Sequence, residues 1–237
     1  MPQRFIFRQV CSRDLATFLA DGEIRSKNHA VGQDCHQTSY QGIVERRGTE
    51  AFPLPHGGVV NDYVPFYFSP ITSFAYTIHK GNVDLRSPDG EVLGRATDDE
   101  RIFFVAAIEK FECCDLTYCF SDIALNSCAP MPKIATDLKE LETHVHWNVF
   151  DEAPRTAHVQ EIGYQGVCAF FANQATPPER QNRSQKRMAE FLVRDCLPLT
   201  YVSCIITKTT VMQASLQAVM DASDWEIPIY TKPGCYF

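Results

Sequence analysis

The 237-residue chain has no apolar run close to the roughly 18 residues that a membrane-spanning helix needs. Its first residues, "MPQRFIFRQVCSRD", also lack the apolar core of a signal peptide. Because neither a membrane span nor a secretion signal is present, we expect a cytoplasmic protein with no membrane partner.

Several sequence signatures of catalysis are missing as well. The chain contains no Walker loop, no G-x-G-x-x-G, no H-E-x-x-H and no G-x-S-x-G. These absences argue against phosphate-loop NTPases, Rossmann dehydrogenases, zinc proteases of the H-E-x-x-H type and α/β hydrolases. Any active site must therefore be built from less regular patterns.

The ten cysteines include no C-x-x-C pair, so they do not form a recognisable zinc or redox motif. In a cytoplasmic protein most of them are expected to be buried, reduced thiols. A zinc site built from Cys35, His36, His144 and His146 is the alternative, but these residues lack the usual ligand spacing. We therefore expect no metal.

The composition is that of an ordinary globular protein, with 45% hydrophobic and 22% charged residues. A chain of this length suits one substantial core, and no linker divides it, so we expect a single domain over residues 1–237. The net charge of −7 argues against a protein that coats nucleic acid with its whole surface. Residues 177–194 differ, because five basic residues against two glutamates give a local charge of +3. That patch fits a small nucleic-acid footprint or an anionic cofactor, and it also fits a merely solvated basic helix face.

Strand and helix signals are mixed along the chain without regular βαβ alternation, which predicts an α+β fold. Segments with strand composition occupy residues 4–10, 63–68, 101–111, 199–208 and 226–237, and the residues around 190 read as the entry to a further strand. Helical spacing occurs in residues 13–24, 69–81, 137–147 and 210–223. Residues 25–62 are mostly loop with one helical turn near "YQGIVERRG".

Two local expectations follow from residue types. The first helix should begin at Ser12 or Asp14 as N-cap and end at Gly22. In "YVPFYF", Pro65 lacks an amide hydrogen, which predicts an edge strand or an irregular start. Strand alternation should place Val64 and Phe66 on one side, and Tyr63, Pro65 and Tyr67 on the other.

Four landmarks occur in one order along the chain. They are "YQGIVERRGTEAFPLPHGGVVNDYVPFYFSP", "FSD" at 120–122, "KRMAEFLV", and an aromatic pair after "TKPGC". Together they resemble the DarT family of bacterial DNA ADP-ribosyltransferase toxins, from about residue 5 to the end of the chain. The resemblance implies an ADP-ribosyltransferase fold, in which central mixed or antiparallel sheets form an NAD cleft with flanking helices.

The resemblance also implies the chemistry. NAD is the substrate, no metal is needed, a base of single-stranded DNA receives the ADP-ribose, and a macrodomain antitoxin is the partner. By resemblance Glu190 is the catalytic glutamate and Arg47 the active-site arginine, with Arg46 as the fallback. From the local pattern alone, Glu190 reads as a surface residue and the two arginines as solvated.

Further cofactor contacts are implied at the first strand and at the aromatic strand. Where the family commonly has a histidine, this chain has Arg8, which we expect to contact NAD unless it simply faces outward from the strand. Tyr63, Tyr67 or Phe68 could pack against nicotinamide or a splayed base.

Two departures from the family pattern bear on the target base. Thymidine-modifying members usually carry an arginine where this chain has Ile71, and a histidine where it has Ala124. Because a branch of the family modifies guanine, these differences favour guanine over thymine.

The segment before Glu190, residues 153–186, is the expected substrate loop. Aromatic side chains for base stacking and basic side chains for phosphates are what single-stranded DNA recognition requires. The candidate DNA-binding residues are Tyr164, Phe171, Arg180, Arg183, Lys186 and Arg187. The alternative for this segment is an ordinary insertion packed by its own aromatic side chains. For the protein as a whole, the alternatives are a transferase acting on protein or RNA, and an inactive NAD- or nucleic-acid-binding module.

Overall fold

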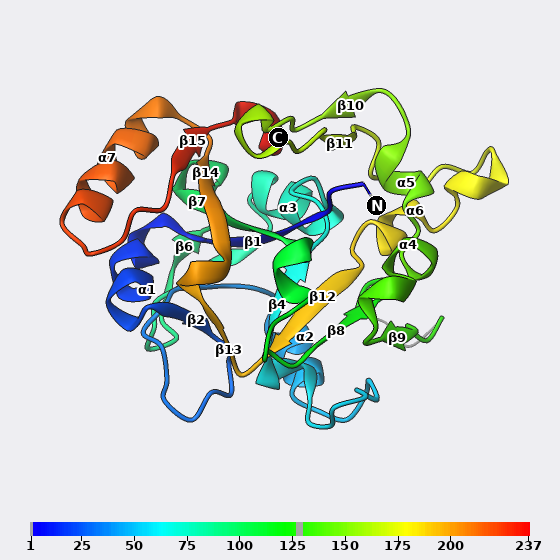
Figure 1. Ribbon diagram of the computed structural model, residues 1–237, viewed down its shortest axis with the longest axis horizontal. Coiled ribbons are helices and arrows are strands. Elements are labelled where there is room, and N and C mark those ends of the chain that lie inside the picture. Colours follow the sequence, from blue (N-terminus) through cyan, green and yellow to red (C-terminus); the bar gives the residue numbers. More distant parts are fainter. Residues whose placement is uncertain (1, 127–129) are drawn as a thin grey trace.

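A mixed sheet of eight strands forms the centre of the computed structural model, which describes residues 2–126 and 130–237 (Figure 1). All neighbouring strands are antiparallel except β14 and β15, which are parallel. The order across the sheet is β15 (Ile229–Thr231), β14 (Val202–Thr207), β7 (Arg101–Ala107), β1 (Phe5–Cys11), β4 (Tyr63–Tyr67), β12 (Glu190–Arg194), β8 (Tyr118–Ser121) and β9 (Ile134–Ala135).

The sheet is divided in its middle, between β1 and β4. These two strands pair only at Phe7 and Tyr67, whereas β4 pairs with β12 over its whole length. The expectation of an edge position for "YVPFYF" is therefore wrong, because β4 is a central strand. Pro65 is tolerated there because its carbonyl points toward the β1 side and accepts a bond from the Arg8 guanidinium. The missing N–H would point to the same side, where β1 has already moved away.

Alternation along the strands separates a core face from a cleft face. Val64 and Phe66 belong to the main core, while Tyr63, Pro65 and Tyr67 line a cavity on the opposite face, as expected from the sequence. β7 is buried along its entire length because it lies between β14 and β1. The main core contains residues from Phe5 to Tyr236. One domain over residues 1–237 remains a prediction.

Two helices pack together beside the strands near β14 and β15 (Figure 1). The helix α1 (Leu15–Asp21) ends at Gly22, which adopts the left-handed conformation expected of a C-cap. Neither Ser12 nor Asp14 caps its N-terminus through a side chain, and the Asp14 carboxylate instead accepts bonds from His36. In α7 (Thr210–Asp221), Leu216 and Met220 are buried against the core.

The remaining helices are short. The turn expected near residue 44 is α2 (Gln41–Arg47), and α3 (Ser73–His79) is capped by the Thr72 hydroxyl. The helix expected over 137–147 is only α4 (Leu141–His144) after a 3-10 turn, because the backbone becomes extended at Val145. Two further four-residue helices are α5 (Asn148–Asp151) and α6 (Arg183–Lys186).

Three small sheets complete the secondary structure. They are β2 (Glu23–Arg25) with β13 (Cys196–Pro198), β10 (Arg155–Thr156) with β11 (Val167–Cys168), and β3 (Gln37–Thr38) with β5 (Asp84–Arg86) and β6 (Val92–Arg95). Within the described ranges, no helix combines the length and apolar character needed to cross a membrane. Nine cysteines are free thiols, five of them buried, and Cys128 lies outside the described residues.

Candidate active site

A cavity of about 320 Å³ opens where β1 and β4 diverge. Its floor comes from these two strands and the start of β12, and its walls come from the polar segment 25–44 and from α2. Ligand pockets typically span a few hundred Å³, so this cavity has the size of a small-molecule site. The long polar segment predicted as loop therefore forms most of one wall.

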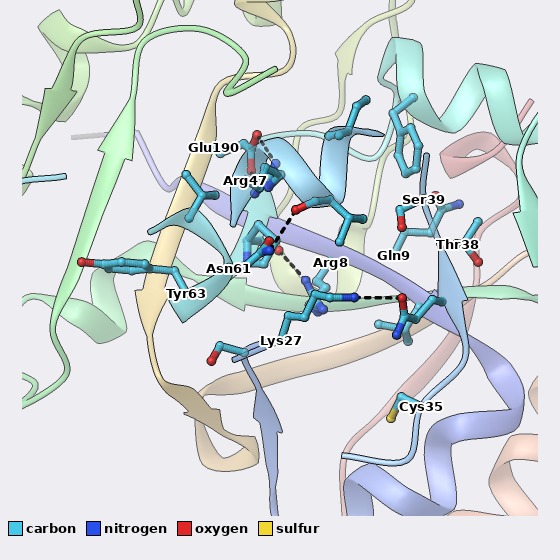
Figure 2. Close-up of a pocket in the computed structure, with 18 of the residues that line it drawn as sticks. Arg8, Gln9, Lys27, Cys35, Thr38, Ser39, Arg47, Asn61, Tyr63 and Glu190 are labelled. Atoms are coloured by element: carbon cyan, nitrogen blue, oxygen red, sulfur yellow. Dashed lines mark hydrogen bonds and ion pairs between the residues drawn. The ribbon is translucent and has the colours of Figure 1, made fainter. Parts of the chain in front are cut away.

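Glu190 and Arg47 meet inside this cavity. Two parallel hydrogen bonds join them, from Arg47 Nη1 to Oε1 at 3.0 Å and from Nη2 to Oε2 at 2.7 Å. Figure 2 shows the two side chains pointing toward each other from β12 and α2. The Glu190 side chain is only 2% exposed and that of Arg47 13%. Burial acts to lower the pKa of Arg47, but the adjacent Glu190 carboxylate outweighs it and holds the pKa above its usual value.

The backbone around Glu190 is fixed by neighbouring strands. Its amide donates to the Ser121 hydroxyl at 2.9 Å, and that hydroxyl donates to the Ile123 carbonyl at 2.7 Å. Glu190 also pairs across the sheet with Tyr67. Burial, reinforced by the Glu190 charge, raises the pKa of the Tyr67 phenol, so Tyr67 is a neutral hydroxyl at physiological pH. The result is one preorganised carboxylate at the cleft edge of a rigid strand.

Two more arginines line the cavity without an acidic partner among the described residues. Arg8 donates to the Pro65 carbonyl at 3.0 Å, and the 4% exposed Arg101 donates to Thr38 and to the Gln9 carbonyl. Neither Nε atom has a hydrogen-bond partner in the part of the chain that the structure describes. Burial lowers the pKa of Arg8 to about 10 and also lowers that of Arg101, yet both guanidiniums remain charged at neutral pH.

This pair of arginines places positive charge inside the cavity that no ion pair among the described residues neutralises. The nearby carboxylate of Asp14 is already engaged by His36, and that of Glu190 by Arg47. Desolvated cations without counter-ions are costly, and a bound anion repays that cost. Sequence reasoning missed Arg101, because an arginine at the start of an apolar strand gives no signal of facing a cavity.

Of the other residues predicted to contact the cofactor, some line the cavity and others do not. Tyr63 and Tyr67 line the cavity. Phe68 does not line the cavity, because it packs in the core against Trp147, Phe150 and Phe191. The expected contact between Phe68 and the cofactor is therefore wrong. Arg46 is on the exposed side of α2, with its guanidinium over the Phe52 ring, and it is not among the cavity residues.

The basic segment before Glu190 is largely used for internal contacts, which corrects the expectation of a basic DNA-binding face. Arg187 is fully buried and donates to the carbonyls of Val149, Cys168, Phe170 and Ile71 and to the Ser69 hydroxyl. Arg183 is buried and pairs with Glu152, as does the partly exposed Arg180. Arg183 and Arg187 thus hold the segment against the core and are not available for phosphates.

The three remaining DNA-binding candidates differ in their surroundings. Tyr164 packs edge-on against Phe5 and at a tilt against Phe7, which is a core contact and not a surface one. Phe171 contacts Tyr76 and Phe237 near the surface. Lys186 is half-exposed and forms no ion pair with any described residue. Of the six candidates, Phe171 and Lys186 therefore keep a position suited to DNA contact.

The described cysteines and histidines do not assemble the alternative zinc site. Two groups of possible ligands lie within reach of one another, Cys11 with Asp14 and His36, and Glu23 with His29 and Cys196. Neither includes His144 or His146, and His36 is held by Asp14. In the first group, burial raises the pKa of the Cys11 thiol, which disfavours the thiolate that a metal would require.

The divided sheet, with a buried Glu–Arg pair at the edge of its cleft, is the fold of an ADP-ribosyltransferase. The chain superposes on Thermus sp. 2.9 DarT in complex with ADP-ribosylated ssDNA with a TM-score of 0.75 at 20% sequence identity. The match covers 99% of this chain and 96% of that chain. Thermosipho africanus DarTG in complex with ADP-ribose matches with a TM-score of 0.67 at 14% identity, over 99% of this chain and 51% of that chain.

Sequence comparisons give the family. The chain matches the model of the family described as ssDNA thymidine ADP-ribosyltransferase, DarT, over residues 7–237, and it belongs to that family. A DNA ADP-ribosyl transferase of Thermus sp. (strain 2.9) is 27% identical over 78% of this chain and 72% of the relative. One from Escherichia coli O127:H6 is 20% identical over 100% and 95%. The protein is therefore an enzyme of the NAD-dependent DNA ADP-ribosyltransferase class, with NAD as its substrate.

Proposed function

We propose that the enzyme transfers one ADP-ribosyl group from NAD to a thymine base of single-stranded DNA, with Glu190 and Arg47 as its catalytic pair. The observation that carries this proposal is the bidentate Arg47–Glu190 contact inside the cavity of a DarT-family chain. When the bond from ribose to nicotinamide breaks, the ribose becomes cation-like, and a fixed carboxylate stabilises that charge.

Glu190 performs the first part of this chemistry. Its carboxylate lies in a largely desolvated position, where its field acts strongly on a nearby cation and costs little reorganisation. It accepts a hydrogen bond from a hydroxyl of the nicotinamide ribose, and it can take the proton that the attacking base releases. Arg47 orients the carboxylate through its two hydrogen bonds, and its planar fork can grip a diphosphate or a base oxygen.

The remaining cations have a role at the other end of NAD. Arg8 and Arg101 present buried, unpaired guanidinium charge that matches the two negative charges of the NAD diphosphate. Replacing Arg101 with methionine should weaken NAD binding by about ten- to a hundredfold, measured by titration calorimetry. Arg86→Met is the matched control, because Arg86 lies in β5 outside the cavity. Equal NAD affinities for both variants would remove Arg101 from the site.

Thymine is favoured over guanine by the family description. The guanine hypothesis relied on the absence of an arginine and a histidine at Ile71 and Ala124. Both residues are buried, and neither lines the cavity. Tyr63 and Tyr67, which are in the cavity, supply aromatic surface suited to either base.

A toxin role with a macrodomain antitoxin is the biological context that we propose. It is supported by the family resemblance and by the match to DarTG, of which this chain covers 51%. Co-expression with a candidate antitoxin should restore growth to cells that express this enzyme, and the Glu190→Ala variant should not impair growth at all. A cytoplasmic location belongs to the same proposal.

The experiment that tests the activity uses purified enzyme, NAD and four single-stranded oligonucleotides, each lacking one base type, with intact-mass analysis. One ADP-ribosyl mass gained on every oligonucleotide except the one without thymine is the expected result. Failure only on the oligonucleotide without guanine would replace thymine with guanine. No mass gain on any DNA, with label appearing on protein or RNA, would reject DNA as the acceptor.

A further inference from the structure

Three aromatic rings from distant parts of the chain form a cluster at the surface. Tyr76 of α3, Phe171 of the segment before α6, and Phe237 at the chain end have centroids 5.0 to 5.3 Å apart in all three pairings. We call these three residues the aromatic platform. None of the three lines the cavity that contains Glu190.

The platform is exposed where most aromatic side chains of this protein are buried. The Tyr76 residue is 37% exposed, and Phe171 and Phe237 are half-buried. Phe170, the neighbour of Phe171 in the sequence, is 43% exposed. Contiguous exposed apolar surface, where it is large, marks interaction sites.

A cation lies over one of these rings. Lys80 Nζ is 5.3 Å from the centre of the Tyr76 ring. Aromatic faces accompanied by basic side chains bind single-stranded nucleic acid, because bases stack on the rings while the cations contact phosphates. An apolar protein partner would not need the cation, which makes a nucleic-acid strand the better occupant.

The platform is connected to the catalytic residues through α3. Ser73 and Tyr76 lie three residues apart, and therefore on the same helix face. The Ser73 hydroxyl contacts Met188 Sδ at 2.6 Å, and Met188 lines the cavity two residues before Glu190. Phe74 of the same helix also lines the cavity. The helix α3 thus connects the cavity wall to the platform.

We propose that the aromatic platform stacks a base that flanks the modified base, and so fixes the path of the DNA strand away from the cavity. This inference rests on the proposed function, because it presumes a single-stranded DNA acceptor. It assigns Tyr76 and Phe237 to DNA binding, together with Phe171, and gives Lys80 a phosphate contact.

The test combines Tyr76→Ala with oligonucleotides that carry one abasic site at each position flanking the target base. Binding without NAD is measured by fluorescence anisotropy, and transfer is measured separately as kcat/KM. At one flanking position the abasic site should weaken binding to the wild-type enzyme by between about 5- and 150-fold, the range of one aromatic–base stack. The same abasic site should change binding to Tyr76→Ala by less than about twofold, because the stacking partner is already gone. Phe171→Ala should show the same loss of sensitivity.

Leu93→Ala is the matched control, since Leu93 is an exposed apolar residue of β6 outside the cavity. It should retain the wild-type sensitivity to the abasic site, and circular dichroism should show all variants to be folded. Equal abasic penalties in the wild type, Tyr76→Ala and Phe171→Ala would overturn the platform even if DNA is modified. Conversely, a Tyr76-dependent abasic penalty in binding with no transfer to any base would support the platform and reject the proposed reaction.

Discussion

The Arg47–Glu190 pair makes a prediction about stability as well as activity. Arg47→Ala leaves a carboxylate that is only 2% exposed without its partner, whereas Glu190→Ala leaves a guanidinium that is 13% exposed and faces the cavity. An unpaired buried charge costs about 3–5 kcal/mol, and access to water reduces that cost. We therefore expect Arg47→Ala to lower the free energy of unfolding by about 3 kcal/mol or more, and Glu190→Ala by less.

The double variant separates the pair from its surroundings. Removing both charges should cost about 1–3 kcal/mol less than the sum of the two single variants, because the double variant leaves no orphaned charge. Urea unfolding measures this coupling, provided that the slope with denaturant stays constant among the variants. If the two losses simply add, the bidentate contact in the cavity is not formed in solution.

The losses of activity should also be less than additive. Each single variant should reduce transfer by about a hundred- to a thousandfold or more, and the double variant should be hardly worse than Glu190→Ala. Groups that act as one catalytic unit are lost together, so a second deletion removes little. A Glu190→Ala enzyme that transfers ADP-ribose within tenfold of the wild type would refute the catalytic assignment.

Three further predictions follow from side-chain positions. Arg46→Ala should retain transfer within about threefold, because the Arg46 guanidinium lies over the Phe52 ring and outside the cavity. If Arg46→Ala loses as much transfer activity as Arg47→Ala on the same oligonucleotide, α2 rotates on binding. Arg187→Met should lower the free energy of unfolding, measured by urea unfolding, by about 3–5 kcal/mol, because the buried Arg187 guanidinium satisfies backbone carbonyls. The salt dependence of DNA binding should not change, because Arg187 contacts no phosphate. Unchanged stability would contradict this prediction. Burial raises the pKa of Cys35 to about 12, so at pH 8 only about one Cys35 thiol in ten thousand is ionised. Iodoacetamide should therefore label the exposed Cys113 first, and the rate of Cys35 labelling should still increase as the pH rises above about 9. Labelling of Cys35 before Cys113, seen by peptide mapping, would refute this assignment.

The sequence predicted those elements whose pattern is local. "RFIFRQV" and "RIFFVAAIEKF" became β1 and β7, and the left-handed Gly22 ends α1. The faces of β4 also followed from alternation alone. What failed was the position of β4 in the sheet, because the rule that confines proline to edges assumes two paired neighbours. Here β1 separates from β4 beside Pro65, and that separation is a tertiary feature that forms the active-site cavity.

The sequence also did not show which charged side chains of the candidate site face the cavity. Counting arginines and lysines in residues 177–194 indicated a DNA-binding face, but a count of charges does not reveal which side chains turn inward. Arg183 and Arg187 are buried among carbonyls and a glutamate, while Arg101, at the start of an apolar strand and outside the basic segment, faces the cavity. The buried guanidinium of Arg187 satisfies four backbone carbonyls, and that of Arg183 bonds the Phe170 carbonyl and Glu152, so both hold the irregular segment against the core. The basic residues nearest Glu190 in sequence thus stabilise the segment around it, and the free positive charge comes from strands far away in the chain.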